Sequence, residues 1–69
     1  MEIKLNHKIE KIDTQKSSIT VEELLAIKNF TFELIIVRIN GALVKKENYS
    51  NQLIAPGNEV QVIHVFGGG

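Results

Sequence analysis

The 69-residue chain contains no cysteine. It therefore has neither a disulfide framework nor a thiol nucleophile, and any sulfur or acyl chemistry must use another group. An excess of charge of one sign is also missing, because eight Lys and Arg residues balance eight Asp and Glu residues. A chain without net charge has no long-range field that attracts phosphates, so neither nucleic acid nor an anionic membrane surface is expected as a partner.

Long hydrophobic runs are absent as well. The longest aliphatic stretch, residues 34–37, ends at Arg38 and is far too short to span a bilayer. The start, MEIKLN, alternates charged and apolar residues and lacks the apolar segment of a secretory signal. These patterns predict a soluble, cytoplasmic protein. A single domain of this length buries only about 60% of its unfolded surface, so its core must be economical.

Two short strands are predicted at the beginning of the chain. Ile3 and Leu5 alternate with polar residues, which is typical of a half-buried strand. Asn6-His7 is a plausible turn, and residues 8–12 predict a second strand. Because Ile9 and Ile12 are three residues apart, this strand is expected to contain a bulge or to end early.

A helix follows the polar loop of residues 13–18. Thr20 and Glu23 have the spacing of a capping box, and Ile19 and Leu24 have the spacing of a hydrophobic staple. The helix is expected to end near Asn29. Its inward-facing stripe consists of residues at i, i+3, i+4 and i+7: Val21, Leu24, Leu25 and Lys28.

The second half of the chain predicts a hairpin and a last strand. Asn40-Gly41 is the strongest short hairpin signal, and a two-residue turn there pairs Ile39 with Ala42. Pro56-Gly57 predicts another turn before the final strand. Alternation places Ile35, Val37, Ile39, Val44, Val60 and Val62 toward the helix, and Leu34, Ile36, Arg38, Leu43, Gln61, Ile63 and Val65 away from it.

This order of elements predicts an α+β fold. The β-grasp (ubiquitin-like) arrangement fits best, with a mixed sheet of four to five strands, one main helix on one face, and the first and last strands as parallel neighbours. A less specific α+β sandwich is the alternative. No predicted element covers the second face of the sheet. Its apolar side chains, Leu34, Ile36, Leu43, Ile63 and Val65, therefore predict a surface for a partner.

The usual catalytic and metal-binding patterns are not found. His7 and His64 lack ligand spacing and are interpreted as a turn residue and a strand residue. Glu22 and Glu23 point in different directions on a helix and suit its dipole better than acid/base work. Ser17-Ser18 has no base signature nearby, and no glycine-rich phosphate loop is present. The sequence therefore predicts no catalytic residue and no metal site.

Three of the five glycines are the last three residues, Gly67, Gly68 and Gly69. They are interpreted either as an incidental frayed end or as a working tail. A segment without Cβ atoms passes through a passage too narrow for other residues, and when extended it reaches about 10 Å beyond the fold. It would carry the Gly69 carboxylate into the enclosed site of another protein. The expected division is a domain of residues 1–66 and a flexible tail of residues 67–69.

Together these features resemble the ThiS-type sulfur carriers of thiamine biosynthesis, in the ubiquitin-like ThiS/MoaD superfamily. The resemblance spans the whole chain and depends on joint spacing, with no single specific motif. Two positions depart from the family pattern: Asn58 replaces an acidic residue, and Lys45-Lys46 replaces Pro-Arg. Asn serves the turn as well as Asp does, but an ionic contact with a partner is not carried over at either place. The matching positions are Asn40-Gly41, Leu43-Val44, Lys46, Tyr49, Gly57-Asn58 and residues 60–69.

The resemblance implies a protein co-substrate and not an enzyme. It implies that an adenylyltransferase resembling a ubiquitin-activating enzyme uses ATP to adenylate Gly69, and that a persulfide donor then converts the adenylate to a thiocarboxylate. A thiazole synthase would take the sulfur, and the carrier itself would hold no permanent cofactor. Ile36, Ile63, Val65 and Phe66 are the expected partner contacts.

Two other functions stay open at this point. The small subunit of molybdopterin synthase shares the fold, tail and sulfur chemistry, but that group is commonly longer and often has prolines before its final Gly-Gly. The only proline here is Pro56, which favours the thiamine interpretation. The other alternative is a non-covalent β-grasp binding module, for which the glycine end would be incidental.

Overall fold

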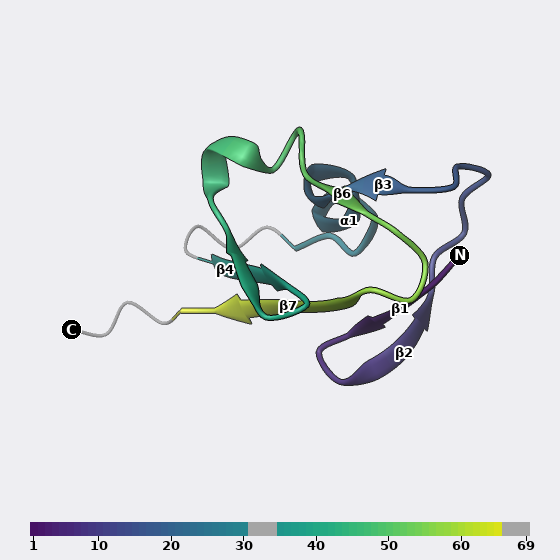
Figure 1. Ribbon diagram of the computed structural model, residues 1–69, viewed down its shortest axis with the longest axis horizontal. Helices are drawn as coiled ribbons and strands as arrows, with labels where there is room; N and C mark the ends of the chain where they lie inside the picture. The colour runs from purple at the N-terminus through teal and green to yellow at the C-terminus, as the bar shows by residue number, and fades with distance from the viewer. Residues whose placement is uncertain (31–34, 66–69) are drawn as a thin grey trace.

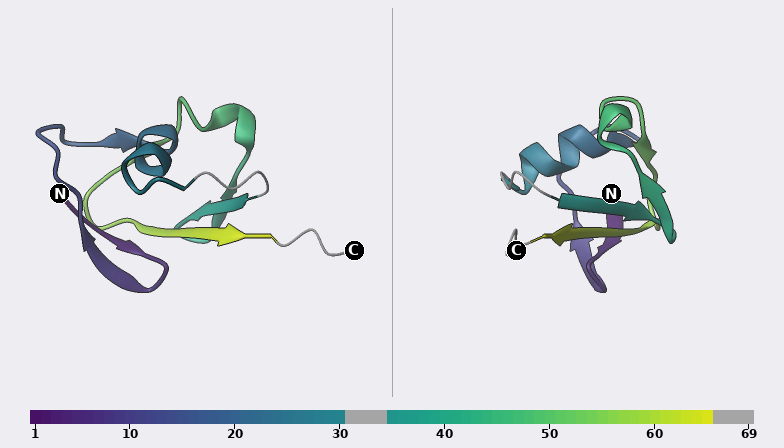
Figure 2. Two further views of the ribbon diagram at one scale, coloured as in Figure 1. Left: turned by 180° about the vertical axis from the view of Figure 1, so that it is seen from behind. Right: turned by 90° about the vertical axis from the view of Figure 1, so that its left-hand side faces the viewer.

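The computed structural model describes residues 1–30 and 35–65 (Figure 1). Its described strands form a five-stranded mixed sheet and a smaller two-stranded sheet. The helix α1 (Val21–Ile27) and the small sheet lie on the same side of the main sheet (Figure 2). The predicted α+β class with a β-grasp arrangement is confirmed. The order of the main sheet is β2 (Lys8–Lys11), β1 (Glu2–Leu5), β7 (Glu59–His64), β4 (Ile35–Ile39) and β5 (Ala42–Val44).

The N-terminal hairpin forms as the alternation predicts. β1 and β2 pair antiparallel, with Leu5 opposite Lys8. Asn6 and His7 both have positive φ (49° and 70°), which is the backbone of a tight two-residue turn. β2 ends at Lys11, and Ile12 then enters the core with 3% exposure. The early end of this strand was predicted from the broken alternation.

The helix begins where the capping box predicts. The Thr20 hydroxyl accepts the Glu23 backbone N–H at 3.1 Å, and the Glu23 carboxylate accepts the Thr20 backbone N–H at 2.9 Å. These contacts satisfy two of the donors that a helix start leaves free. Asn29, with φ 56°, ends the turn that follows the helix. Val21 and Leu24 are fully buried and hold α1 against the sheet.

The second hairpin also has the predicted register. Ile39 pairs with Ala42, Arg38 with Leu43, and Val37 with Val44. Asn40 and Gly41 both have positive φ, 50° and 86°, so the turn requires residues that tolerate the left-handed region.

β7 lies between β1 and β4 at the centre of the main sheet. It runs parallel to β1 and antiparallel to β4. The turn before it has Gly57 at φ 83°, and the Asn58 N–H donates to the Ala55 carbonyl at 3.1 Å. The predicted parallel pairing of the first and last strands is confirmed.

Three short elements were not predicted. β3 (Ile19–Thr20) pairs antiparallel with β6 (Leu53–Ile54), and a 3-10 helix, η1, spans Lys46–Asn48. Strands of two residues are too short to show an alternation in the sequence. The two strands contribute to the hydrophobic core, because Ile19 and Ile54 are among the most buried side chains.

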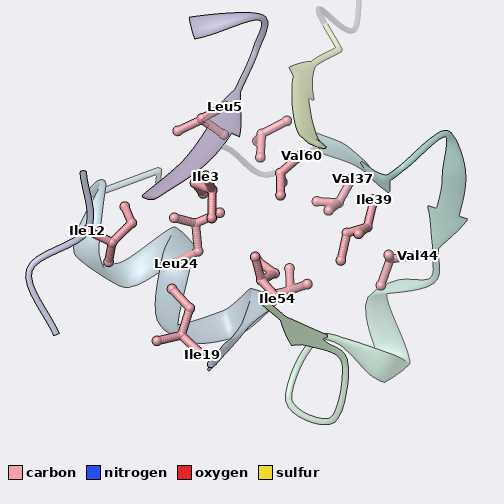
Figure 3. Packing of buried hydrophobic residues seen from close by; sticks show 12 residues of the cluster. Ile3, Leu5, Ile12, Ile19, Leu24, Val37, Ile39, Val44, Ile54 and Val60 are labelled. Atoms are coloured by element: carbon pink, nitrogen blue, oxygen red, sulfur yellow. The ribbon is translucent and has the colours of Figure 1, made fainter. Parts of the chain in front are cut away.

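The hydrophobic core lies between the main sheet and the layer of α1, β3 and β6. Its side chains converge from both layers (Figure 3). Ile35 is partly buried and packs against this core, so every predicted inward residue of the described strands is on the predicted face. The buried members are Ile3, Leu5, Ile12, Ile19, Val21, Leu24, Val37, Ile39, Val44, Ile54, Val60 and Val62.

Candidate functional site

The outer face of the main sheet carries the predicted partner residues. Along β7, Val60 and Val62 point into the core with 0% and 8% exposure. Ile63 alternates outward with 39% exposure, and Val65, just after the strand, has 38%. Because side chains alternate between the two faces of a strand, β7 directs one set into the core and leaves the other set exposed for a partner.

Neighbouring strands extend this face. Ile36 of β4 lies opposite Ile63 of β7, and Leu43 of β5 lies opposite Arg38 of β4. Ile36 is partly exposed and Leu43 is 63% exposed. We call Ile36, Leu43, Ile63 and Val65 the apolar patch. No described element covers it (Figure 2).

The other predicted members of this surface lie outside the described residues. They are Leu34, Phe66 and the tail residues Gly67, Gly68 and Gly69. Phe66 and the tail follow Val65 in the chain, and Ile63 and Val65 are the exposed apolar residues that precede them. The structure therefore places three of the four predicted contact residues, Ile36, Ile63 and Val65, on one face at one end of the sheet.

Two exposed cations border the apolar patch. Arg38 is exposed, lies between Leu43 and Gln61 in the register, and takes part in no ion pair among the described residues. Lys45 follows β5 in extended backbone conformation (φ −74°, ψ 146°) and is also exposed. The patch is thus apolar at its centre and basic beside β4 and β5.

The side chains of two asparagines hold β7 in place, which the sequence did not reveal. Asn6 Oδ1 accepts the Val62 backbone N–H at 2.8 Å, and Asn40 Oδ1 accepts the Glu59 backbone N–H at 2.9 Å. Both residues are in turns with positive φ. Each turn therefore ties the central strand to its neighbour as well as reversing the chain. Asparagine at both hairpin turns was the available signal, but the partners are 56 and 19 residues away.

The remaining polar groups have structural roles. The Glu23 carboxylate accepts the Thr20 backbone N–H at the helix cap and forms an ion pair with Lys16. The Lys16 ammonium, followed by the Thr20 backbone N–H, holds the pKa of Glu23 below its ordinary value of 4.5. A carboxylate in that state is ionised at neutral pH and is not a proton donor.

Tyr49, the aromatic residue of the family pattern, packs against the core and is partly buried. Its carbonyl accepts the Glu22 backbone N–H at 2.9 Å, which links the segment after η1 to the start of the helix. Burial raises the pKa of Tyr49 above 10.0. This position serves the fold and not the outer face.

The histidines do not form a site in the described part of the chain. His7 Nδ1 lies 3.8 Å from Glu59 Oε1, and His7 Nε2 lies 3.3 Å from Gln61 Nε2. All of this is on exposed surface. Residues 1–30 and 35–65 contain no group of three His, Cys, Asp or Glu residues that could hold a metal ion. They also contain no helix long and apolar enough to cross a membrane.

Comparison with known proteins identifies the family. A model of the ThiS family matches residues 3–69. The crystal structure of the thiamine biosynthesis protein ThiS from Geobacter metallireducens has a TM-score of 0.84 and 30% identity, with 100% of both chains covered. An NMR solution structure of a thiamine biosynthesis protein from that organism has a TM-score of 0.77 and 26% identity, covering 100% of this chain and 88% of that one. A search of curated proteins found no match. The chain belongs to the ThiS family of sulfur carriers, as its residue pattern predicts.

Proposed function

We propose that this protein carries sulfur on its C-terminal Gly69 for thiazole formation in thiamine biosynthesis. The observation that carries the proposal is the family match, which extends through the glycine tail to residue 69. The apolar patch supports it, because its member Val65 is separated from the tail by only Phe66 in the sequence, so an enzyme docked on the patch would hold the chain close to the segment that ends at Gly69. Residues 1–66 would form the domain that binds the partner, and residues 67–69 would form the tail that carries the reactive carboxylate.

The chemistry requires a partner because a carboxylate is a poor electrophile. An adenylyltransferase would direct the Gly69 carboxylate to the α-phosphorus of ATP, releasing pyrophosphate and leaving an acyl-adenylate. The terminal sulfur of a persulfide would then attack the acyl carbon and release AMP. A second thiol would cleave the sulfur–sulfur bond of the acyl persulfide, leaving the thiocarboxylate on Gly69 and a disulfide on the donor side.

The chain itself contributes no thiol to these steps, because it has no cysteine. No internal thiol therefore competes for the activated acyl group. The carrier holds no permanent cofactor in this scheme, and ATP is a substrate of the activating partner. A thiazole synthase would receive the sulfur, and all partners would meet the carrier in the cytoplasm.

Docking would use Ile36, Ile63, Val65 and Phe66. The first three lie on the open face of the sheet in the described chain. Apolar side chains at the centre of an interface supply most of its energy, and the basic residues at its border orient the partner.

Intact-mass measurement tests the proposal. After incubation with ATP, a persulfide donor and the cognate adenylyltransferase, replacement of one oxygen by sulfur adds about 16 Da. The matched control carries one alanine after Gly69, which moves the carboxylate away from the position that the partner activates. An unchanged mass together with no trapped adenylate would rule out the carrier role and favour the non-covalent binding module.

Delivery of the sulfur separates the two pathways. The protein with the thiocarboxylate should support thiazole formation by the thiazole synthase and not dithiolene formation by the large subunit of molybdopterin synthase. Transfer to the pterin alone would favour the molybdopterin alternative.

A further inference from the structure

The β2 strand forms an open edge of the main sheet. It pairs with β1 and with no other described strand, and no described element lies beyond it (Figures 1 and 2). An open edge offers backbone donors and acceptors to another strand. The end of the sheet near β2 plays no part in the proposed sulfur chemistry.

The hydrogen-bonding pattern shows which backbone groups are available. In a two-residue turn such as Asn6-His7, the flanking Leu5 and Lys8 exchange both hydrogen bonds, and the next pair exchanges none. The Lys4 N–H accordingly points to β7's side, where it donates to the Asn58 carbonyl at 2.9 Å. Ile9, opposite Lys4, therefore directs its N–H and C=O away from β1, out of the sheet edge.

The side chain at this position is also unusual. Ile9 is 72% exposed, the highest value among the exposed large hydrophobic residues of the described chain. It borders a surface hollow of about 500 Å³ that is also lined by Lys4 and Pro56. Ile9 therefore combines unpaired backbone hydrogen-bonding groups with an exposed apolar side chain on the edge strand.

The flanking charges are self-complementary. When β2 pairs antiparallel with β2 of a second copy about Ile9, the two Ile9 residues lie opposite each other. Lys8 of each copy then lies opposite Glu10 of the other. Opposite charges in cross-strand positions stabilise a pair of strands, and so do apolar residues in contact.

We propose that the β2 edge pairs with the β2 edge of a second copy of this chain, so that the two main sheets become continuous. Two hydrogen bonds between the Ile9 backbones form the centre, and two Lys8–Glu10 pairs flank it. Each copy contributes one four-residue strand. This contact is smaller than that of a permanent dimer, so the association is weak and depends on concentration.

The surroundings of both charges are compatible with this pairing. Glu10 Oε1 pairs with Lys28 of the same chain, and the Glu10 side chain stays 31% exposed. A carboxylate has a second oxygen that accepts further hydrogen bonds. Lys8 is exposed and takes part in no ion pair in residues 1–30 and 35–65.

The pairing leaves the proposed docking face open. A twofold axis between two antiparallel edges is perpendicular to the sheet, so both helices lie on one side and both outer faces on the other. The apolar patch belongs to β4, β5 and the end of β7, which are separated from β2 by β1. Self-association and activation of Gly69 are therefore independent.

Charge-swap variants test the proposal by sedimentation equilibrium over a range of concentrations up to the millimolar. Lys8→Glu alone places Glu opposite Glu, and Glu10→Lys alone places Lys opposite Lys. Each single variant should dimerise about tenfold more weakly than the unmodified chain, because two cross-strand pairs change from attraction to repulsion. An equimolar mixture of the two variants restores both opposite-charge pairs and should associate as strongly as the unmodified chain.

Ile9→Lys provides a second test, with Leu53→Lys as its matched control. Leu53 is 55% exposed on β6, away from the edge. Ile9→Lys should abolish association, and Leu53→Lys should leave it unchanged. Circular dichroism verifies that all variants fold, and the intact-mass assay with the adenylyltransferase should give unchanged sulfur loading.

Two outcomes would overturn the inference. One is an unmodified chain that stays monomeric at every concentration. The other is association that the single charge variants and their mixture share equally, because the contact would then lie elsewhere on the molecule. Neither outcome affects the proposed sulfur chemistry, which the mass assay tests separately.

Discussion

Adjacent residues of β7 allow the two faces of the sheet to be tested with the same substitution. Val62 points into the core with 8% exposure, and Ile63 points outward with 39% exposure. We predict that Val62→Asp removes much or all of the free energy of unfolding, whereas Ile63→Asp leaves a folded protein that binds its activating partner more weakly. The two variants have the same charge and differ by one position in the chain.

The magnitudes follow from the two environments. A domain of this size has a free energy of unfolding of roughly 3–10 kcal/mol. A carboxylate at Val62 enters the apolar core and loses its hydration, which costs about 4 kcal/mol or more. At Ile63 the carboxylate stays hydrated, and the loss of partial apolar burial and of strand preference amounts to about 1–2 kcal/mol.

Two measurements separate the effects. Thermal unfolding followed by circular dichroism should show a cooperative transition for Ile63→Asp, and a far lower midpoint or no transition at all for Val62→Asp. Binding of Ile63→Asp to the adenylyltransferase, measured by calorimetry, should be at least about tenfold weaker than that of the unmodified chain, because the charge lies within the apolar patch.

Two results would contradict these expectations, each for a different reason. If Ile63→Asp unfolds while Val62→Asp folds, the assignment of the two faces is wrong. If Ile63→Asp folds and binds the partner normally, the faces are right but the apolar patch is not the docking surface.

Four further predictions concern single residues. Thr20→Ala should lower the free energy of unfolding by about 1 kcal/mol in urea titrations, because the helix loses its cap; an unchanged midpoint would contradict this. Folding lowers the pKa of Glu23. The charged carboxylate therefore stabilises the protein at every pH above the pKa of the unfolded chain, and this stabilisation is lost as the pH falls through the lower pKa of the folded protein. Glu23→Gln retains a capping side chain, so its stability difference from the unmodified chain should shrink on acidification, and a constant difference would refute the assignment. Gly41→Ala should cost about 1–2 kcal/mol from its positive φ alone, because nothing lies within 4 Å of an added Cβ, while Gly41→Asn should cost less. Arg38→Glu should slow association with the adenylyltransferase at low salt, with the difference closing at high salt; equal rates at all salt concentrations would exclude Arg38 from the docking surface.

Local signals made much of the fold predictable. Asn40-Gly41 determines the second hairpin because both residues tolerate positive φ, and its register then assigns each side chain to a face. The spacing of Thr20 and Glu23 located the start of the helix for a similar reason, since the capping contacts span only three residues. Interactions of this kind depend on neighbours in the chain and can be recognised without the fold.

Contacts between distant segments were not predictable in the same way. The pairing of β3 with β6 joins Ile19 to Ile54, and strands so short have no detectable periodicity. Ile9 was recognised as part of a strand with a broken alternation. Its exposure depends on the register with Lys4, which places it on the outer face of the sheet edge.

The candidate site was predictable where it depends on alternation. The outward positions of Ile36, Ile63 and Val65 follow from the inward positions of the valines beside them. The support for the site was not predictable, because Asn6 and Asn40 act through side-chain bonds to a strand that comes later in the sequence.

The central position of β7 explains how one strand can serve both stability and recognition. Its inward valines pack in the core. The backbone N–H groups of Val62 and Glu59 also donate to asparagine side chains in the two hairpin turns, so the strand is held by packing and by hydrogen bonds. The outward side chains therefore contribute less to stability, and they can vary with the partner at a smaller cost to the fold. Phe66 and the glycine tail follow Val65 in the chain. In the proposed function, a partner that binds Ile63 and Val65 therefore holds the chain immediately before the residues that carry the reactive carboxylate, so that one strand couples docking to delivery.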